Sequence, residues 1–266
     1  MRSARAPGAT QRPDPSGTRV SADHFSAVAR DYARYRPSYP AELFAALTRV
    51  APGRRAAWDC ATGAGQAATG LAAHFARVVA TDRSPPLLHA APRHPRVWYV
   101  AARAEASPLP AGWADLITVA QALHWLELPS FYDEARRVLA PDGVLAVWTY
   151  DTVRLEPPGL DAAVQRLYRN RLRGYWPAER ALVEQGYRSL PFPFAPVEAP
   201  RVAMTAQWSR AELLGYLRTW SATERFRAAR GVDPVALAEP EIAAAWPADR
   251  ERIGVHWPLT VRLGRR

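Results

Sequence analysis

Acidic residues and glycines follow one another in the first half of the chain, and their types suit the binding of a polar ligand. The stretch WDCATGAGQAATGLA contains Asp59, then Gly63 and Gly65, just before an alanine-rich helical pattern. Glycines let a ligand approach the backbone closely, and the amides at the start of a helix attract an anion. Asp82 and Glu105 each follow a further apolar run. The spacing therefore predicts one ligand site built from the ends of successive elements.

The glycine loop alone admits more than one ligand. Residues 63–68, GAGQAA, fit the G-x-G-x-x-G/A dinucleotide fingerprint, with an acid about 20 residues further on. A pyrophosphate or a carboxylate would suit the start of the helix. Asp59 favours a ligand with a cation or several donors, because an unpaired carboxylate in a buried strand is costly. S-adenosylmethionine carries an ammonium, a carboxylate and a sulfonium but no phosphate, and it meets both conditions. Alternatively, Asp59 only caps loop amides.

The other two acids each have a functional and a structural interpretation. Asp82 could accept hydrogen bonds from both ribose hydroxyls of a nucleoside, or it could cap the next helix. Glu105 could accept from an adenine amino group, or it could be a solvated loop acid. Taken together, three acids after three successive strands predict a site for a purine nucleoside.

Apolar runs alternate with helical patterns, which is typical of a parallel sheet covered on both faces. Ligands bind such sheets at the carboxyl ends of the strands, where the three acids lie. The predicted strands are 56–62, 77–82, 97–102, 114–123 and 143–150, with helices near 66–76, 85–91 and 130–140. Later patterns predict helix over 159–190, a strand at 200–208, helices near 209–220 and 234–246, and a last strand within 253–263.

The composition argues against several classes of function. The net charge is +10, but every basic residue is arginine and the excess is partly terminal, so we expect no stable nucleic-acid partner. Cys60 is the single cysteine, and His89 and His94 lack carboxylate neighbours, so we expect neither a disulfide nor a metal site. No apolar run reaches ~20 residues, and no secretory signal begins the chain. We expect a cytoplasmic monomer or homodimer without membrane contact.

The first residues differ in composition from the rest. Residues 1–20 are rich in Arg, Pro, Ser, Gly and Thr, and we expect a disordered tail there. We expect one domain over 21–266. Its parts are a helical cap at 21–50, a cofactor-binding core at 56–150, and substrate-cap insertions with a sixth strand at 151–254.

The chain resembles class I S-adenosylmethionine-dependent methyltransferases, and more narrowly the type 11 group related to trans-aconitate methyltransferase. The resemblance is carried by FSAVARDYARYRPSYP, AWDCATGAGQAA, VVATDRS, AEASPLP, VAQALHW and RRVLAPDGVLAVW. It implies an α/β fold with a Rossmann-like seven-stranded sheet whose last strand, 255–263, is antiparallel. It also implies an N-terminal helical cap and a helical insertion after the fifth strand.

The resemblance implies roles for residues along the whole cofactor, S-adenosylmethionine or its product S-adenosylhomocysteine. Many relatives have glycine where this chain has Ala61, which places a methyl group close to the cofactor. The methionine part is matched by Asp59, Ala61, Gly63, Gly65 and Gln66, the ribose and adenine by Asp82, Arg83, Ala104 and Glu105, the sulfonium surroundings by Gln121, Leu123 and Trp125, and a lid by Tyr32 and Arg36.

The sequence gives less information on the residues that bind the methyl acceptor than on those that bind the cofactor. His124 is the one base candidate beside the expected methyl position, but it could instead orient the substrate or pack against Trp125. A carboxylate acceptor needs no base, whereas a phenol or alcohol benefits from one. Candidate pocket residues, each of which could equally be core or a packed helix face, are Tyr39, Tyr175, Trp176, Phe192, Phe194, Tyr216 and Trp220, with Arg171, Arg173 and Arg180 near them.

These observations predict an S-adenosylmethionine-dependent methyltransferase that O-methylates a small organic acid or a phenol. The aromatic side chains and nearby arginines favour a flat or apolar acid as the small-molecule partner. An RNA or protein methyltransferase is one alternative, and a relative that holds the cofactor without catalysis is another.

Overall fold

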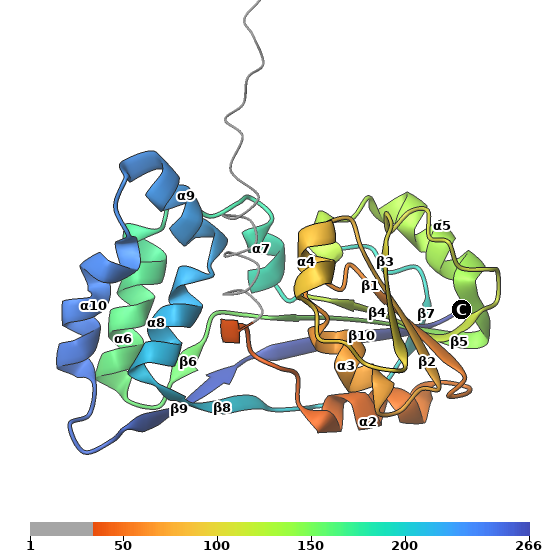
Figure 1. Cartoon of the computed structure of the whole chain (residues 1–266), viewed down its shortest axis with the longest axis horizontal. Helices are drawn as coiled ribbons and strands as arrows, with labels where there is room; N and C mark the ends of the chain where they lie inside the picture. The colour runs from red at the N-terminus through yellow and green to blue at the C-terminus, as the bar shows by residue number, and fades with distance from the viewer. Residues whose placement is uncertain (1–33) are drawn as a thin grey trace, which may run out of the picture.

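A seven-stranded sheet forms the centre of the protein in a computed structural model that describes residues 34–266. The expected tail at 1–20 and Tyr32 lie outside the described residues. The strand order is β3-β2-β1-β4-β5-β10-β7, parallel from β3 to β5, with β10 antiparallel to both of its neighbours (Figure 1). The strands are β1 (Ala56–Cys60), β2 (Arg77–Asp82), β3 (Val97–Ala101), β4 (Ala114–Ala120), β5 (Leu139–Tyr150), β7 (Ala195–Val197) and β10 (Leu259–Arg265). The predicted Rossmann-like sheet with an antiparallel last strand is confirmed.

Helices cover both faces of this sheet because its central strands are apolar on both sides. All five residues of β1 are buried; Ala57 packs with one helical layer, and Trp58 and Cys60 pack with the other. This division follows from the alternation of side chains along a strand. The first layer contains α2 (Ala41–Val50) and α3 (Gln66–Ala72), the second contains α5 (Leu128–Val138) and α7 (Arg180–Glu184), and α4 (Pro85–Ala90) follows β2.

A second, smaller sheet lies beside the first and has its own apolar core (Figure 1). Its strand order is β6-β9-β8, all antiparallel. The small sheet and its helices lie at the opposite end of the molecule from α5 (Figure 1). The chain runs from β9 of the small sheet into β10 of the large sheet. The elements are β6 (Arg154–Leu155), α6 (Pro158–Arg166), a π-helical turn (Leu167–Arg171), β8 (Met204–Ser209), α8 (Arg210–Arg218), α9 (Ser221–Arg230), α10 (Pro234–Ala245) and β9 (Arg252–Trp257).

The predicted last strand is in fact two strands that belong to different sheets. β9 ends at Trp257 and β10 begins at Leu259, with Pro258 between them. Proline has no backbone N–H, so it cannot continue a ladder. The Pro258 carbonyl instead accepts from the Asp151 amide at 3.0 Å. This break lets one continuous chain cross from the small sheet to the large one.

Two further predictions after residue 150 are wrong in detail. The strand predicted at 200–208 is β8, which pairs in the small sheet, and the edge of the large sheet is the short β7 instead. β7 is short, largely exposed and contains Pro196, so it lacks an apolar strand pattern. The helix predicted over 159–190 ends in the π-helical turn, and only α7 follows within that range. Helix α9 was not predicted.

The structure also bears on membrane insertion. Within residues 34–266, every helix is too short or too polar to cross a bilayer.

Candidate active site

A cavity of about 650 Å³ lies at the carboxyl ends of β1, β2 and β3, where the sequence places the acids. Its volume is in the range of small-ligand sites. Most of the predicted cofactor residues line it together. They are Arg36, Ala61, Gly63, Gln66, Asp82, Arg83, Ala104, Glu105, Gln121 and Trp125, and the predicted substrate residue Tyr39 lines it as well.

Asp82 is fixed at the wall of this cavity by two backbone amides. Its Oδ2 accepts from Gly63 N–H at 2.9 Å, and its Oδ1 accepts from Ser84 N–H at 2.8 Å. A carboxylate has about four lone-pair positions, so each oxygen retains one toward the cavity. The acid therefore ties the glycine loop to the end of β2 and still presents an acceptor to a ligand.

The two loop glycines have different surroundings. Both have left-handed backbone, with φ of +58° at Gly63 and +82° at Gly65. Gly63 lines the cavity and has open space where a side chain would begin, whereas a Cβ on Gly65 would lie 2.5 Å from the Tyr99 hydroxyl. Gly65 does not line the cavity; it is the N-cap residue of α3 and allows that helix to pack close to β3.

This difference predicts separable effects of two matched substitutions. Gly65→Ala is expected to destabilise the fold by about 1–3 kcal/mol, since it combines left-handed strain with a clash against Tyr99. Gly63→Ala carries the strain alone, about 1–2 kcal/mol, but puts a methyl group into the cavity. Urea unfolding and calorimetry with S-adenosylhomocysteine measure the two effects. Two results together would contradict these roles of Gly63 and Gly65. They are equal losses of stability in the two variants and tighter ligand binding by Gly63→Ala than by Gly65→Ala.

Asp59 is fully buried and does not line the cavity, unlike the expectation that its carboxylate meets the ligand ammonium. Its Oδ2 accepts from the Thr62 hydroxyl at 2.5 Å, and its Oδ1 accepts from the Thr118 hydroxyl at 2.7 Å. Burial raises the pKa of Asp59 to about 6, although these hydrogen bonds and one from the Ala68 amide oppose the rise. In this structure Asp59 braces the glycine loop against β4.

Asp59→Asn is expected to change how stability depends on pH. The folded-state pKa of Asp59 lies near 6, above its unfolded value of 3.8, so its stabilising contribution is present at low pH and is lost as pH rises through 6. The loss is about 3 kcal/mol. The asparagine variant should therefore gain stability relative to wild type between about pH 4 and 8. Urea unfolding across this range tests it, and a constant difference between the two proteins would rule it out.

The remaining predicted cofactor residues are Leu123, Ala61 and Glu105. Leu123 is fully buried in the core and does not reach the cavity. Ala61 lines the cavity with φ of +55°, a left-handed conformation that glycine adopts more readily than alanine. Burial acts to raise the pKa of Glu105, but hydrogen bonds from backbone amides and Arg103 outweigh it and hold that pKa below its usual value. Glu105 is therefore an ionised acceptor.

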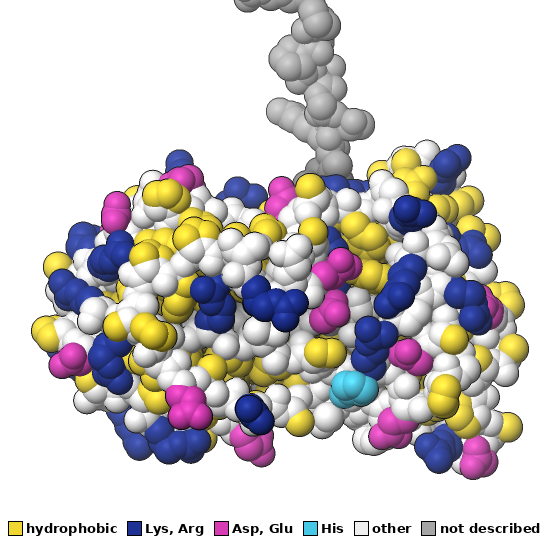
Figure 2. Space-filling view, turned by 180° about the vertical axis from the view of Figure 1, so that it is seen from behind, with side chains coloured by type: hydrophobic (Ala, Val, Ile, Leu, Met, Phe, Trp, Pro, Cys, Tyr) yellow, Lys and Arg dark blue, Asp and Glu magenta, His cyan; other side chains and the backbone are white. Residues whose placement is uncertain are grey.

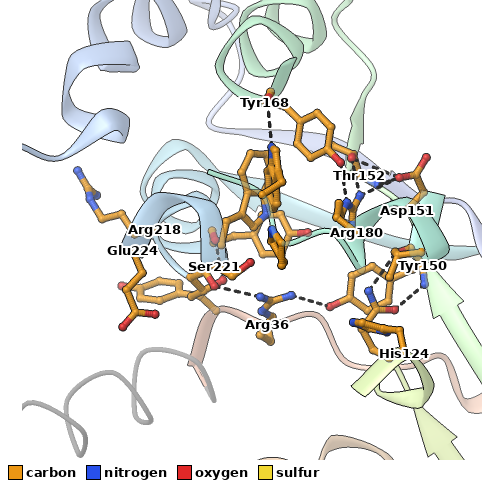
Figure 3. A pocket seen from close by; sticks show the side chains of 18 of the residues that line it. Arg36, His124, Tyr150, Asp151, Thr152, Tyr168, Arg180, Arg218, Ser221 and Glu224 are labelled. Carbon is orange, nitrogen blue, oxygen red and sulfur yellow. Dashed lines mark hydrogen bonds and ion pairs between the residues drawn. The ribbon is translucent and has the colours of Figure 1, made fainter. Parts of the chain in front are cut away.

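A second cavity has a volume of about 580 Å³, and most of its lining side chains are drawn in Figure 3. Both cavities are lined by Arg36, Gln121, Trp125 and Tyr150, so they meet at these four residues. The other walls of the second cavity come mainly from α8, α9 and the segment between β5 and the end of α7. They are aromatic and basic, with Tyr35, Tyr168, Trp176, Tyr216 and Trp220 beside Arg180, Arg218 and Arg227.

Arg180 is held rigidly in the second cavity. Its guanidinium donates to Asp151 at 2.8 Å, to the Thr152 hydroxyl at 2.8 Å and to the Tyr168 hydroxyl at 2.6 Å (Figure 3). It also lies 5.4 Å from the centre of the Trp176 ring. Arginine fixed in this way is well suited to bind a carboxylate.

Only some of the residues predicted to form the pocket for the methyl acceptor line the second cavity. Trp176 lines it, and Tyr175 instead packs on Phe226 and accepts a hydrogen bond from Arg230. Tyr216 and Trp220 line it too. Phe192 and Phe194 pack against Tyr132 in the core of the large sheet, and Arg171 and Arg173 are exposed away from the cavity.

His124 lines the second cavity and contacts Tyr187, which was not predicted as a site residue. Its Nδ1 lies 2.6 Å from the Tyr187 hydroxyl oxygen. Burial lowers the pKa of His124 to about 4, and the nearby Arg180 adds to the effect. The imidazole is therefore neutral at pH 7 and is a weak proton acceptor.

Tyr150, Asp151 and Thr152 were also missed as site residues. They end β5 and follow it directly, much as the predicted acids lie at or just beyond the carboxyl ends of β1, β2 and β3. The position of Asp151 after an apolar strand was the available signal. Tyr168 and Tyr187 come from the segment after β5, and their sequence surroundings gave no signal.

Comparison with known proteins is consistent with this site. A family of methyltransferase domains matches residues 58–147. A solved structure from Anaeromyxobacter dehalogenans, assigned as a type II methyltransferase, is 45% identical, with a TM-score of 0.81 over 87% of this chain and 98% of that chain. A protein of Dictyostelium discoideum that is named as a methyltransferase is 29% identical over 96% of this chain and 98% of its own length.

The similarity thus extends over most of the chain, well beyond the matched domain at 58–147. The chain belongs to the S-adenosylmethionine-dependent methyltransferases of class I.

Proposed function

We propose that this enzyme methylates an oxygen atom of a small organic acid, with a carboxylate as the favoured acceptor. The observation that carries the proposal is the junction of the two cavities at Arg36, Gln121, Trp125 and Tyr150. A cofactor in the first cavity and an acceptor in the second would meet there. Holding two reactants in line can supply ~7–11 kcal/mol of a barrier.

The first cavity fits the cofactor that the family uses. Asp82 would bind the ribose hydroxyls, Glu105 and Ala104 would face the adenine, and the loop at Gly63 would hold the methionine end. S-adenosylmethionine supplies an electrophilic methyl group on a sulfonium when it is bound. The protein's part is to orient it, and the exposed Trp125 and the buried Tyr150 lie on either side of the reacting groups at the junction in this proposal.

The second cavity favours an anionic, flat acceptor. Three arginines besides Arg36 line it, against the two acids Asp151 and Glu224, and aromatic rings form its walls. Arg180 is the best placed to bind a carboxylate because it is the most rigidly held. A carboxylate is already nucleophilic, so the weak basicity of His124 is no obstacle, whereas a phenol would benefit from a stronger base.

A screen of carboxylic acids and phenols tests the proposal. The protein is incubated with S-adenosylmethionine and each compound, and mass spectrometry detects the gain of one methylene group. We expect methyl esters of flat or aromatic acids, and little product from phenols. If no small molecule gains mass while S-adenosylhomocysteine binds, the non-catalytic alternative replaces the proposal.

Nucleic-acid or protein methylation is a different outcome of the same assay. Acidic and basic side chains are interspersed on the face drawn in Figure 2, which supports only weak, salt-dependent binding of nucleic acid. Incubation of total RNA and of cell protein with labelled S-adenosylmethionine examines this directly. Incorporation into either polymer, without any small-molecule product, would overturn the small-acid proposal.

A further inference from the structure

Tyr187 is held in a backbone conformation that a bulky residue rarely adopts. Its φ is +59°, directly after Gly186 at +60°, just beyond the end of α7. The position is fixed by its own amide, which donates to the Leu182 carbonyl at 2.9 Å, and by Arg262, which donates to the Tyr187 carbonyl at 2.6 Å. Such strain persists only where the surroundings enforce it, and it is often found at functional sites.

The strained turn buries the Tyr187 hydroxyl behind the 3₁₀ turn Leu123–Trp125. Burial raises the pKa of this phenol, while the backbone amides of His124 and Leu123 act to lower it. The phenol hydrogen needs an acceptor inside the core, and a phenol O–H is a stronger hydrogen-bond donor than the N–H of a neutral imidazole.

The acceptor for that hydrogen is His124 Nδ1, which lies 2.6 Å from the hydroxyl oxygen. Thr149 also faces Tyr187. Its hydroxyl donates to Gln121 Oε1 at 2.9 Å, so the Thr149 oxygen can still accept, but an imidazole nitrogen is the more basic acceptor. An imidazole that accepts at Nδ1 carries its proton on Nε2.

We propose that Tyr187 is a positioning residue that locks His124 as the Nε2–H tautomer, so that His124 presents a hydrogen-bond donor, and not a base, to the methyl acceptor. The donor role rests on the function proposed above. An N–H group beside Arg180 suits one oxygen of a carboxylate while the other oxygen attacks the methyl group. The same group cannot remove a proton from a phenol, so the acceptor must arrive already ionised.

The charged groups that face His124 support this protonation state. Arg180 disfavours the imidazolium, and Glu179 opposes Arg180 with a smaller effect. Protonation of Nδ1 would reverse this bond, since the Tyr187 oxygen would then have to accept from Nδ1–H and the hydroxyl hydrogen would need another acceptor. Geometry and charge therefore favour the same neutral form.

Long-range ¹H–¹⁵N NMR of the full-length, ¹⁵N-labelled protein tests the tautomer directly. The signals of His124 are identified by their absence in His124→Gln. We expect a pyrrole-type Nε2 and a pyridine-type Nδ1 that persist from about pH 6 to 8, the range in which an ordinary histidine titrates. Tyr187→Phe is expected to lose this single tautomer and to give averaged or Nδ1-protonated signals.

Tyr132→Phe is the matched control, because the Tyr132 hydroxyl is also in the core but donates to the Pro191 carbonyl at 2.7 Å. It should leave the His124 signals unchanged. A proton on Nδ1, or an imidazolium near neutral pH, in the wild-type protein would overturn the proposal whether or not Tyr187→Phe folds. A failed acceptor screen would remove the proposed function but would leave the tautomer result standing, so the two failures are distinguishable.

Discussion

Asp82→Ala is expected to weaken the binding of S-adenosylhomocysteine by about 1–3 kcal/mol, roughly 5- to 150-fold. The variant removes a charged acceptor from the cavity wall and leaves the Gly63 amide without its partner. Both the ribose contacts and the shape of the glycine loop depend on this carboxylate. Isothermal titration calorimetry with S-adenosylhomocysteine measures the loss.

Asp133→Ala provides a matched control, because Asp133 does not line the cavity. Asp133 is exposed on α5 and forms a surface ion pair with Arg136, so its removal should leave the affinity unchanged. Asp82→Asn should fall between the alanine variant and wild type, since it retains one carbonyl acceptor. An unchanged affinity in Asp82→Ala, or binding of NAD without any response to S-adenosylhomocysteine, would remove Asp82 from its assigned role.

The lining of the first cavity was largely predictable because its determinants are local. Each acid follows its own apolar strand, and parallel strands bring their carboxyl ends to one edge of the sheet. Asp59 shows the limit of that argument. A buried acid at a strand end was expected to meet a ligand, but Thr62 and Thr118 satisfy it within the protein. Whether a hydroxyl on the neighbouring strand reaches a carboxylate depends on register, which the pattern does not specify.

The lining of the second cavity was poorly predicted because its residues come from distant segments. Arg36 donates to the Tyr150 hydroxyl and to the Thr219 carbonyl, contacts that join three parts of the chain. Tyr175 and Trp176 are adjacent aromatics with the same composition around them, yet only Trp176 lines the cavity. Side-chain packing of the small sheet decides between them, and periodicity carries no information on that packing.

Arg180→Met is expected to lower kcat/KM for a carboxylate acceptor by roughly 30- to 150-fold, a loss of about 2–3 kcal/mol. Methionine keeps much of the volume between Tyr168 and Trp176 but removes the charge. Arg180→Lys should recover part of the activity, because it restores the charge without the planar fork. Steady-state kinetics with the acid that the screen identifies, and with S-adenosylmethionine at saturation, measures both.

Arg171→Met separates the local effect from a general change in charge. Arg171 lies on the π-helical turn near Tyr168 but is exposed outside the cavity, so this variant should keep wild-type kinetics. Arg180 also holds Asp151 and Thr152, so circular dichroism must show that Arg180→Met is folded before its kinetics are compared. A folded Arg180→Met enzyme with unchanged kcat/KM for the acid would place the acceptor carboxylate elsewhere in the cavity. Equal losses for acids and neutral acceptors would mean that Arg180 shapes the cavity and does not bind the charge.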